Sequence, residues 1–445
     1  MLLFSFVSIV SKLFTSLGLI LLARYFGPEN YGLYSSNLAI ASIILSFINF
    51  GILDNLLINK NNKELISKST SWLNTTVVIS LVILLLFKEY LLAGIVLWSY
   101  FYRVIQMLLV GLGQLENNYE LVSLVQIFYL MTYLISIILL YVFKLTLIEF
   151  VLANVSFSII ITLILMVMNK NYKEQVNFLK LDFSFDILRQ SYRYGYSGLF
   201  AFIYMSSDLI MIKYLKGNYE AGIYSVGTTF IFAFYFLSDI FYRFFLPKIS
   251  KNHREGISIN NLISEFLYFT ILFILPVGLG MLLFSYELVF YFFDKEFISS
   301  VNVLNLLSFA FLIHIFAYIP GIILTAINKQ KQKNKIQIIV ALFNIVANFY
   351  LIPIYSYMGA VYSTIASEAL LLTMYLYGSL KYVENLRISF KYQIGVFLSI
   401  MTLSFLVLKY IEIDFLWKFI IASLILFVMY ILNKQSITEV LYAHK

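Results

Sequence analysis

The chain of 445 residues contains no cysteine, only three histidines and few charged residues. The lack of cysteine excludes disulfide bonds, thiolate nucleophiles and cysteine metal sites, and three scattered histidines exclude a histidine-rich metal cluster. Charged residues make up 12% of the chain and hydrophobic residues 61%, whereas a soluble domain has about 25% and about 45–50%. The composition therefore excludes a water-soluble domain, and we expect no metal and no cofactor.

The sequence consists largely of long apolar segments with few charged residues. Runs of about 18 or more residues, each long enough to cross a bilayer core of about 30 Å, recur along the chain. Runs such as TTVVISLVILLLF do not alternate as barrel strands do, so the sequence predicts an all-α, polytopic membrane protein. The N-terminal run is too long for a cleavable leader and has no small-residue cleavage site. We expect about fourteen transmembrane helices, near residues 2–23, 36–58, 72–88, 91–112, 119–142, 147–168, 194–215, 221–245, 264–285, 300–327, 335–352, 357–380, 390–409 and 413–433.

Lysine and arginine are distributed unevenly among the connecting segments. If the N-terminus is cytoplasmic, the inner segments and their helix ends hold roughly 21 of these residues and the outer segments roughly eight. The asymmetry predicts that both termini are cytoplasmic. The segment 328–335, NKQKQKNK, is one of the inner loops, and we expect it to meet anionic lipid rather than nucleic acid. The outer loops are short, so no extracytoplasmic domain is expected.

A short phrase occurs twice in the chain. YGLYS ends at Ser35 and AGIYS ends at Ser225, about 190 positions later, and a cationic-aromatic pair precedes each copy. Six predicted helices separate the copies, and an even number gives both the same orientation, which predicts a parallel repeat about an axis along the membrane normal. We expect Gly32 and Gly222 to permit tight turns at helix ends, and Tyr34 and Tyr224 to lie at the membrane interface.

Three longer stretches carry a family resemblance. They are LLARYFGPENYGLYS, the segment from YGYSGLFAF to FFLPKIS, and FNIVANFYLIPIYSYMGAVYSTIASE. Together, over residues 1 to about 380, they resemble the Wzx-type O-antigen and capsule polysaccharide flippases, which belong to the multidrug, oligosaccharidyl-lipid and polysaccharide exporter superfamily. The resemblance implies two six-helix lobes in a V around a central cavity, at residues 1–185 and 190–382. It also implies two additional helices with a cytoplasmic tail at 383–445, and a multi-pass protein of the bacterial inner membrane.

Three deep or interfacial cations lie in the first predicted lobe. Lys12 and Arg103 are near the centres of their helices, and Arg24 is at the outer end of the first helix. A charge at the bilayer centre costs about 2.5–3.5 kcal/mol on insertion scales, so each needs a reason. Both side-chain types suit phosphate oxygens, and we expect these three to line a cationic substrate cavity. The alternatives are structural pairing with another helix and, above all for Arg24, extension to the lipid head groups.

Ionisable groups in the second predicted lobe include Asp208, Glu368 and His314. Burial favours the protonated form of a carboxyl group, and histidine changes charge near neutral pH. These three residues are therefore candidates for coupling or gating during transport. The alternative for each is a hydrogen bond that packs one helix against another.

The function predicted from these features is the transfer of an undecaprenyl-diphosphate-linked oligosaccharide unit from the cytoplasmic to the outer leaflet by alternating access. The expected partners are this lipid-linked oligosaccharide, membrane lipid, and the polymerase and chain-length regulator of the same pathway. No nucleotide-binding loop occurs in the sequence, and we expect no enzymatic activity. The alternatives are an ion-coupled multidrug-type exporter and, in a different class, a polysaccharide polymerase or an O-antigen ligase.

Overall fold

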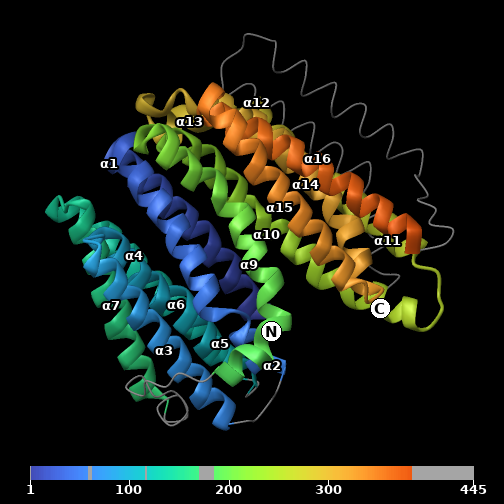
Figure 1. The fold of residues 1–445 in the computed structure, drawn as a ribbon, viewed down its shortest axis with the longest axis horizontal. Helices are drawn as coiled ribbons and strands as arrows, with labels where there is room; N and C mark the ends of the chain where they lie inside the picture. The colour runs from blue at the N-terminus through green and yellow to red at the C-terminus, as the bar shows by residue number, and fades with distance from the viewer. Residues whose placement is uncertain (1, 59–62, 116–117, 170–184, 383–445) are drawn as a thin grey trace. The chain divides into compact units, whose positions relative to one another are not determined.

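The computed structural model describes residues 2–58, 63–115, 118–169 and 185–382 (Figure 1). Every regular element within these ranges is helical, which confirms the predicted all-α class. The chain divides into two compact units. Unit 1 consists of Met1–Ser225 and Ile345–Ala360, and unit 2 consists of Val226–Asn344 and Val361–Lys445.

Unit 1 is organised around its first helix, which packs against three others in the same unit. Helix α1 contacts α9, α6 and α4, while α7 packs on α6 and α4. Figure 1 shows α6 and α7 running side by side. The helices of this unit are α1 (Leu2–Asn49), α2 (Ile52–Ile58), α3 (Lys63–Leu86), α4 (Tyr90–Ser99), the π-helical η1 (Tyr100–Ile105), α5 (Gln106–Leu115), α6 (Tyr119–Phe143), α7 (Leu147–Met168) and α9 (Phe185–Lys216).

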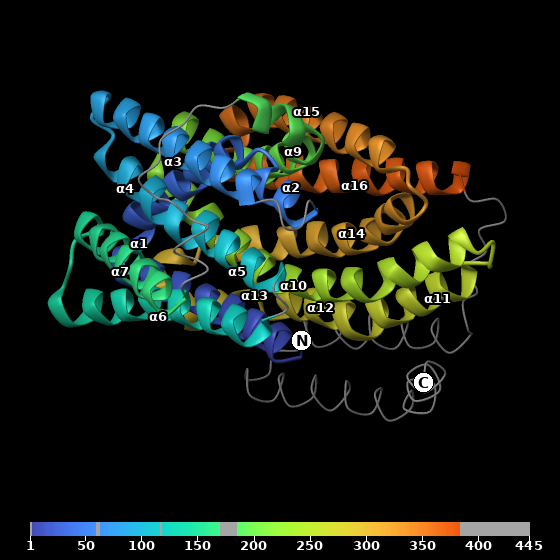
Figure 2. The ribbon, with the colours of Figure 1, turned by 90° about the horizontal axis from the view of Figure 1, so that it is seen from below.

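Unit 2 is built on a core of aromatic and branched apolar side chains. Phe245, Phe266 and Phe269 pack there with Ile319 and Ile323, and α14 contacts both α11 and α12 (Figure 2). Most of α10, the first part of α15 and all but the first residues of α16 belong to this unit. The helices are α10 (Asn218–Arg254), α11 (Asn260–Phe269), the π-helical η2 (Thr270–Ile274), α12 (Leu275–Leu283), α13 (Ser285–Phe293), the 3₁₀-helical η3 (Lys295–Phe297), α14 (Ser300–Ala326), α15 (Gln330–Tyr355) and α16 (Tyr357–Tyr382).

Four of the connections that the sequence places on the outer side are tight turns, whereas the connection between α12 and α14 contains α13 and η3. Lys88, Lys144, Gly217 and Ser356 each adopt a positive φ at such a turn, a conformation that reverses the chain in few residues. After Lys144, α7 begins with a capping box in which the side chains of Thr146 and Glu149 bond to each other's backbone N–H groups. These helix starts and stops leave the turns too short to hold a folded domain.

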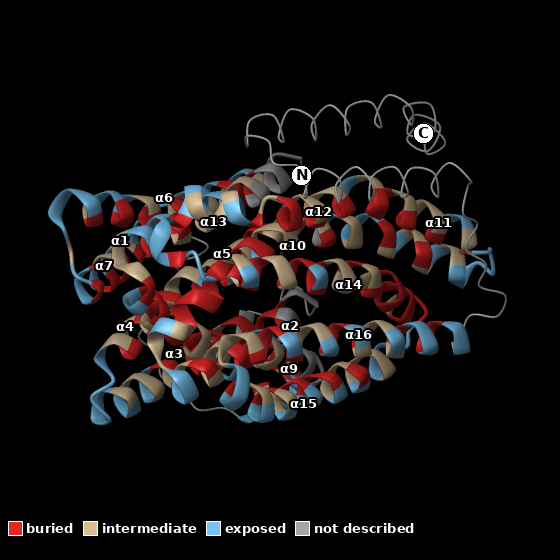
Figure 3. Cartoon of the chain, turned by 90° about the horizontal axis from the view of Figure 1, so that it is seen from above, coloured by how far each residue is buried: buried red, intermediate tan, exposed pale blue. Residues whose placement is uncertain are grey.

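Apolar side chains cover much of the helix surface as well as the core. Ten helices in the described ranges are long and apolar enough to cross a membrane, or up to eleven if a bent pair within α10 counts as one span. Large apolar residues on α3 and α7 are exposed, for example Ile83 at 48% and Leu152 at 56%, and the turn between α6 and α7 is exposed in Figure 3. An exposed apolar helix face is suited to lipid, so the chain is a multi-pass membrane protein.

The predicted number of helices is not reached within the described residues. The first apolar stretch, Val10–Asn49, contains a backbone kink at Gly27 (φ 68°, ψ 177°) and includes parts of the first two predicted helices. The thirteenth and fourteenth predicted helices, near 390–409 and 413–433, lie outside the described residues. The count of fourteen and the lobe boundaries at 185 and 382 stay predictions.

Candidate functional site

The two copies of the repeated phrase touch each other within unit 1. The hydroxyl groups of Ser35 and Ser225, which hold the same position in the two copies, are hydrogen-bonded at 2.7 Å. A Cβ atom placed on Gly32 would collide with the backbone of Asn218, and one placed on Gly222 would collide with the backbone of Pro28. Asn218 follows Pro28 by the same interval of 190 residues, so the contact is symmetric. We call this contact the repeat crossing and define it by Gly32, Ser35, Gly222 and Ser225.

The repeat crossing corrects two expectations. Gly32 and Gly222 lie inside helices α1 and α10, and the left-handed turn is made five residues earlier, by Gly27 (φ 68°) and Gly217 (φ 104°). The motif glycines therefore permit close backbone approach and not a turn. Tyr34 and Tyr224 do not face lipid or water as residues of an interfacial aromatic belt would, because they are exposed by only 1% and 3%.

Arg103 lies in the π-helical segment η1, in the middle of the span Tyr90–Gln114. Single π-helical turns inside α-helices are rare and are frequent at functional sites. The side chain of Arg103 is exposed, and its Nη1 donates a hydrogen bond to the hydroxyl of Ser42 on α1 at 2.7 Å. The guanidinium group thus takes part in no ion pair among the described residues.

Aromatic residues with hydrogen-bond donors surround Arg103. Tyr34 and Tyr102 are neighbours of the guanidinium. The indole of Trp98 lies 5.3 Å from the ring of Tyr102 and is stacked on Tyr133 at 5.9 Å. The Tyr34 hydroxyl, the Trp98 Nε1 and the Tyr133 hydroxyl are buried and have no hydrogen-bond partner among the described residues. We call Arg103 with these four aromatic residues the donor cluster.

The donor cluster has the chemistry of a site for negative charge. Its groups are a guanidinium, an indole N–H and phenol hydroxyls, and it includes no carboxylate. Buried polar groups in proteins almost always have a partner, and an unsatisfied donor costs about 1–3 kcal/mol. Sequence reasoning identified Arg103 but missed the aromatic residues, since tyrosine and tryptophan are common throughout an apolar chain.

The other two predicted cations lie on the same helix as each other but at different depths. Lys12 and Arg24 are both exposed on α1, and twelve residues of helix separate them by about 18 Å. Thr15, one turn from Lys12, approaches the hydroxyl of Tyr102 at 3.5 Å, so Lys12 and Arg103 lie at a similar depth in unit 1. Arg24 is therefore too far along α1 to share one phosphate with Lys12.

Asp208 forms a buried polar site in unit 1. It is 6% exposed; its Oδ1 accepts a hydrogen bond from the side-chain amide of Asn348 at 2.5 Å and its Oδ2 accepts one from the Tyr224 hydroxyl at 2.7 Å. Tyr224 belongs to the second copy of the repeat. The carboxylate of Asp208 therefore connects α9 and the second copy to the end of α15. Within the described residues no group of three or more histidine and acidic side chains could hold a metal ion.

His314 and Glu368 come together in unit 2. His314 Nδ1 is 3.0 Å from Glu368 Oε2, and the Glu368 side chain is only 3% exposed. The ring of Tyr235 lies 4.8 Å from the imidazole ring, and the rings of His314 and Tyr318 are 5.8 Å apart. Sequence reasoning named both residues separately and did not pair them, because 54 positions separate them on two helices.

Comparison with known proteins adds a family match and a fold match. The sequence matches the family described as "Polysaccharide biosynthesis protein" over residues 1–253. No curated protein sequence matches the chain. Among solved structures, "Lipid II flippase MurJ, inward closed conformation" is similar with a TM-score of 0.75 at 16% identity, covering 98% of this chain and all of that one. The inward-facing and outward-facing conformations of a multidrug resistance MATE family transporter give TM-scores of 0.57 and 0.51 at 12% and 11% identity, covering 83% and 86% of this chain and 94% and 96% of theirs.

Proposed function

Since the chain belongs to the polysaccharide biosynthesis protein family, we propose that it moves a lipid-linked oligosaccharide across the membrane, as a flippase. The substrate is an oligosaccharide unit on undecaprenyl diphosphate, carried from the cytoplasmic to the outer leaflet of the bacterial inner membrane. The fold shared with a lipid II flippase is consistent with this activity, because the substrate named for that structure is also a lipid.

The donor cluster is the observation that carries the proposal. A diphosphate has several negatively charged oxygens, and arginine is suited to them because its donors form a planar fork. Arg103 lies at mid-span with a neutral serine as its partner, beside buried donors that lack an acceptor. A passing phosphate group would meet the exposed guanidinium of Arg103, while the buried donors add positive potential around it. Lys12, at a similar depth, would add a second positive charge, and Arg24 would meet the substrate nearer the outer side.

Two further polar sites are candidates for coupling transport to a conformational change. The His314–Glu368 pair changes its net charge when it takes up or releases a proton, and the Asp208 carboxylate joins the second copy of the repeat to α15. Protonation of either acid would weaken its present contacts and allow its helices to shift. The repeat crossing is the corresponding candidate for an outer gate.

The alternatives fit the observations less well. An exporter of cationic drugs would need deep acidic residues in unit 1 that are not already engaged, whereas Asp208 is bonded to an amide and a phenol and Arg103 is cationic. A polymerase or ligase would be expected to have a long outer loop, and the turns after α3, α6, α9 and α15 are short.

The proposal is tested in proteoliposomes that contain the purified full chain and a fluorescent lipid-linked oligosaccharide. Appearance of the fluorophore in the opposite leaflet is followed by a quencher that does not cross the membrane. We expect transport by the wild type, and a rate about 10–100-fold lower for Arg103→Gln, because a charge-assisted hydrogen bond contributes about 1.5–3 kcal/mol. The transport rate of Arg103→Lys should lie between those of the wild type and Arg103→Gln, since lysine keeps the positive charge but lacks the forked donors of the guanidinium group.

The matched control is Arg189→Gln, which removes the same group from an exposed position of α9 and should transport normally. The same oligosaccharide on a monophosphate lipid tests whether Arg103 recognises the diphosphate. Arg103→Gln should reduce the transport of this substrate less than it reduces the transport of the diphosphate substrate. Wild-type rates for Arg103→Gln would remove the donor cluster from the mechanism. No transport of any lipid-linked sugar by the wild type would contradict the flippase function.

A further inference from the structure

Three lysines come together at one end of unit 2, away from the sites described above. Lys329 lies just before α15, Lys333 lies in its first turns, and Lys381 lies in the last turn of α16. The connection between α14 and α15 turns sharply at Asn328, which has a φ of 61°. This turn brings lysines of α15 back beside the ends of α14 and α16.

Tyrosine rings hold the ammonium groups of these lysines. The Lys329 Nζ is 4.4 Å from the centre of the Tyr382 ring, and the Lys381 Nζ is 5.8 Å from the same ring. The Lys333 Nζ lies 5.7 Å from the Tyr242 ring and donates a hydrogen bond to the Thr325 hydroxyl at 3.1 Å. Aromatic faces attract cations, so the Tyr382 ring restricts Lys329 and Lys381 to one place. The Tyr242 ring restricts Lys333, which lies one turn along α15 from Lys329.

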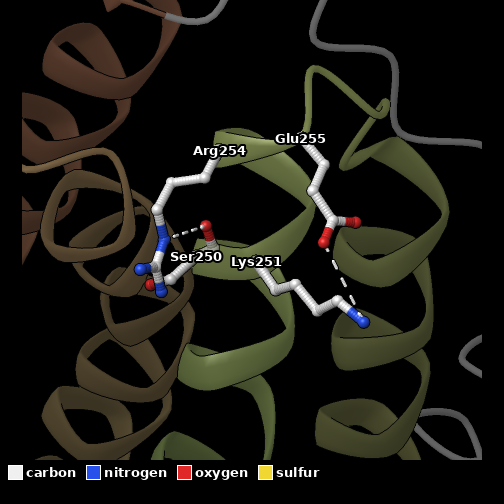
Figure 4. A network of polar contacts seen from close by, with 4 residues as sticks. All are labelled: Ser250, Lys251, Arg254 and Glu255. Atoms are coloured by element: carbon white, nitrogen blue, oxygen red, sulfur yellow. Dashed lines mark hydrogen bonds and ion pairs between the residues drawn. The ribbon is translucent and has the colours of Figure 1, made fainter.

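The positive charge of this cluster is not balanced by the described residues. At the end of α10, Glu255 pairs with Lys251 at 4.0 Å, and Arg254 donates to the carbonyl of Ser250 (Figure 4). The other ion pair within the described ranges joins His314 of α14 to Glu368 of α16 and lies within the membrane-spanning helices. Lys329, Lys333 and Lys381 therefore take part in no ion pair among the described residues.

Helix dipoles do not supply the missing negative charge. The N-terminus of α15 adds to the positive charge, while the C-terminal ends of α14 and α16 each offset only about half a charge. Three full charges thus remain largely uncompensated at the end of membrane-spanning helices. An anion with several oxygens would bridge them, and lysine binds phosphate as a point charge.

We propose that Lys329, Lys333 and Lys381 bind the phosphate of an anionic phospholipid head group. The ends of spanning helices lie at the depth of the head groups, where tyrosine is enriched, and a basic residue near an anionic leaflet gains about 1 kcal/mol. Apolar side chains of the adjoining helices, such as Leu380 (57% exposed) and Tyr377 (71% exposed), are available to the acyl chains. The inference does not depend on the proposed flippase function.

The test measures lipid binding to the purified full chain in neutral detergent. Phosphatidylglycerol is titrated, with phosphatidylcholine as the neutral comparison, and binding is followed by native mass spectrometry and by the rise in melting temperature. We expect saturable binding of phosphatidylglycerol alone. Lys329→Gln with Lys333→Gln should weaken it about 30-fold, which corresponds to about 1 kcal/mol for each lysine.

The matched control is Lys331→Gln with Lys335→Gln, which removes the same charge from the same segment at exposed positions and should bind within about threefold of the wild type. Equal loss in both double variants would mean that only the general surface charge matters, and would overturn the proposal. Inorganic phosphate should not raise the melting temperature at millimolar concentration; if it does, the lipid is not required and the assignment of a head group is wrong. Should the double variant not fold, Lys381→Gln alone must still weaken binding in the same assay.

Discussion

The repeat crossing makes a prediction that is independent of function. Alanine in place of Gly32 would put its Cβ 2.6 Å from the backbone nitrogen of Gly222 and closer still to the carbonyl oxygen of Asn218. Real Cβ atoms almost never approach other atoms within 3.0 Å, and here the neighbours are backbone and not flexible side chains. The two segments must therefore separate by roughly an ångström or more, which is overpacking that costs about 1–3 kcal/mol.

The same reasoning applies to Gly222, whose added Cβ would lie 2.8 Å from the carbonyl carbon of Pro28. Because both methyl groups would open the same contact, the Gly32→Ala and Gly222→Ala effects should not add. Once the first methyl has separated the segments, the second should cost less than it does alone. A double-mutant cycle between the two positions measures this difference.

The assay is thermal unfolding of the purified chain, followed by tryptophan fluorescence. Trp72 and Trp98 are both buried in unit 1, at 4% and 5% exposure, so they report on the unit that contains the crossing. Each single variant should lower the melting temperature, by a few degrees per kcal/mol. Gly198→Ala and Gly280→Ala are the controls, because nothing lies within 4 Å of their added Cβ atoms. Inside a helix, alanine is more stable than glycine by about 0.5–1 kcal/mol, so these two control variants should not lose stability. If the Gly32→Ala variant melts at the same temperature as the Gly198→Ala variant, the two backbones are not in close contact at the repeat crossing.

Two further predictions concern the crossing and the buried ion pair. Ser35→Cys with Ser225→Cys should form a disulfide on oxidation, free of competing thiols since the chain has no cysteine, and should stop transport until a reductant is added; unchanged transport by the cross-linked protein would show that the crossing does not open. His314→Ala removes one hydrogen-bond partner of a carboxylate that is 3% exposed and should cost about 1–3 kcal/mol of stability. Adding Glu368→Gln should recover most of that loss in thermal unfolding, and fully additive effects would contradict the pairing.

The helices were predictable from sequence because the bilayer imposes a minimum length on every span. Apolar runs of that length therefore mark helices directly, and the family match over residues 1–253 confirms the resemblance inferred from the motifs. Which helices pack together was not predictable in the same way. Lipid tails are as apolar as leucine, so an apolar face does not identify its partner.

The candidate site was predictable one residue at a time. Arg103, His314 and Glu368 were identified singly, because an ionisable residue within a span is costly and needs an explanation. Their surroundings come from other helices and could not be inferred: the phenol and indole groups around Arg103 belong partly to α1 and α6, and Glu368 is 54 positions from His314. The glycine of the repeat was interpreted wrongly for a related reason, since close approach of two distant backbones leaves no signal in local sequence.

The composition of the repeat crossing bears on how it would act as a gate. Its contact consists of glycine backbone and one hydrogen bond between two serine hydroxyls, and such a bond contributes only about 0.5–1.5 kcal/mol net. An ion pair or interlocked aromatic rings at the same place would hold the segments more tightly. Small neutral residues allow close contact when the segments meet and cost little when they part. Lys213 Nζ also donates a hydrogen bond to Asn37 Oδ1 at 2.6 Å, and α1 packs along α9. The two copies of the phrase are therefore only a weak part of the contact that the proposed gate would have to break.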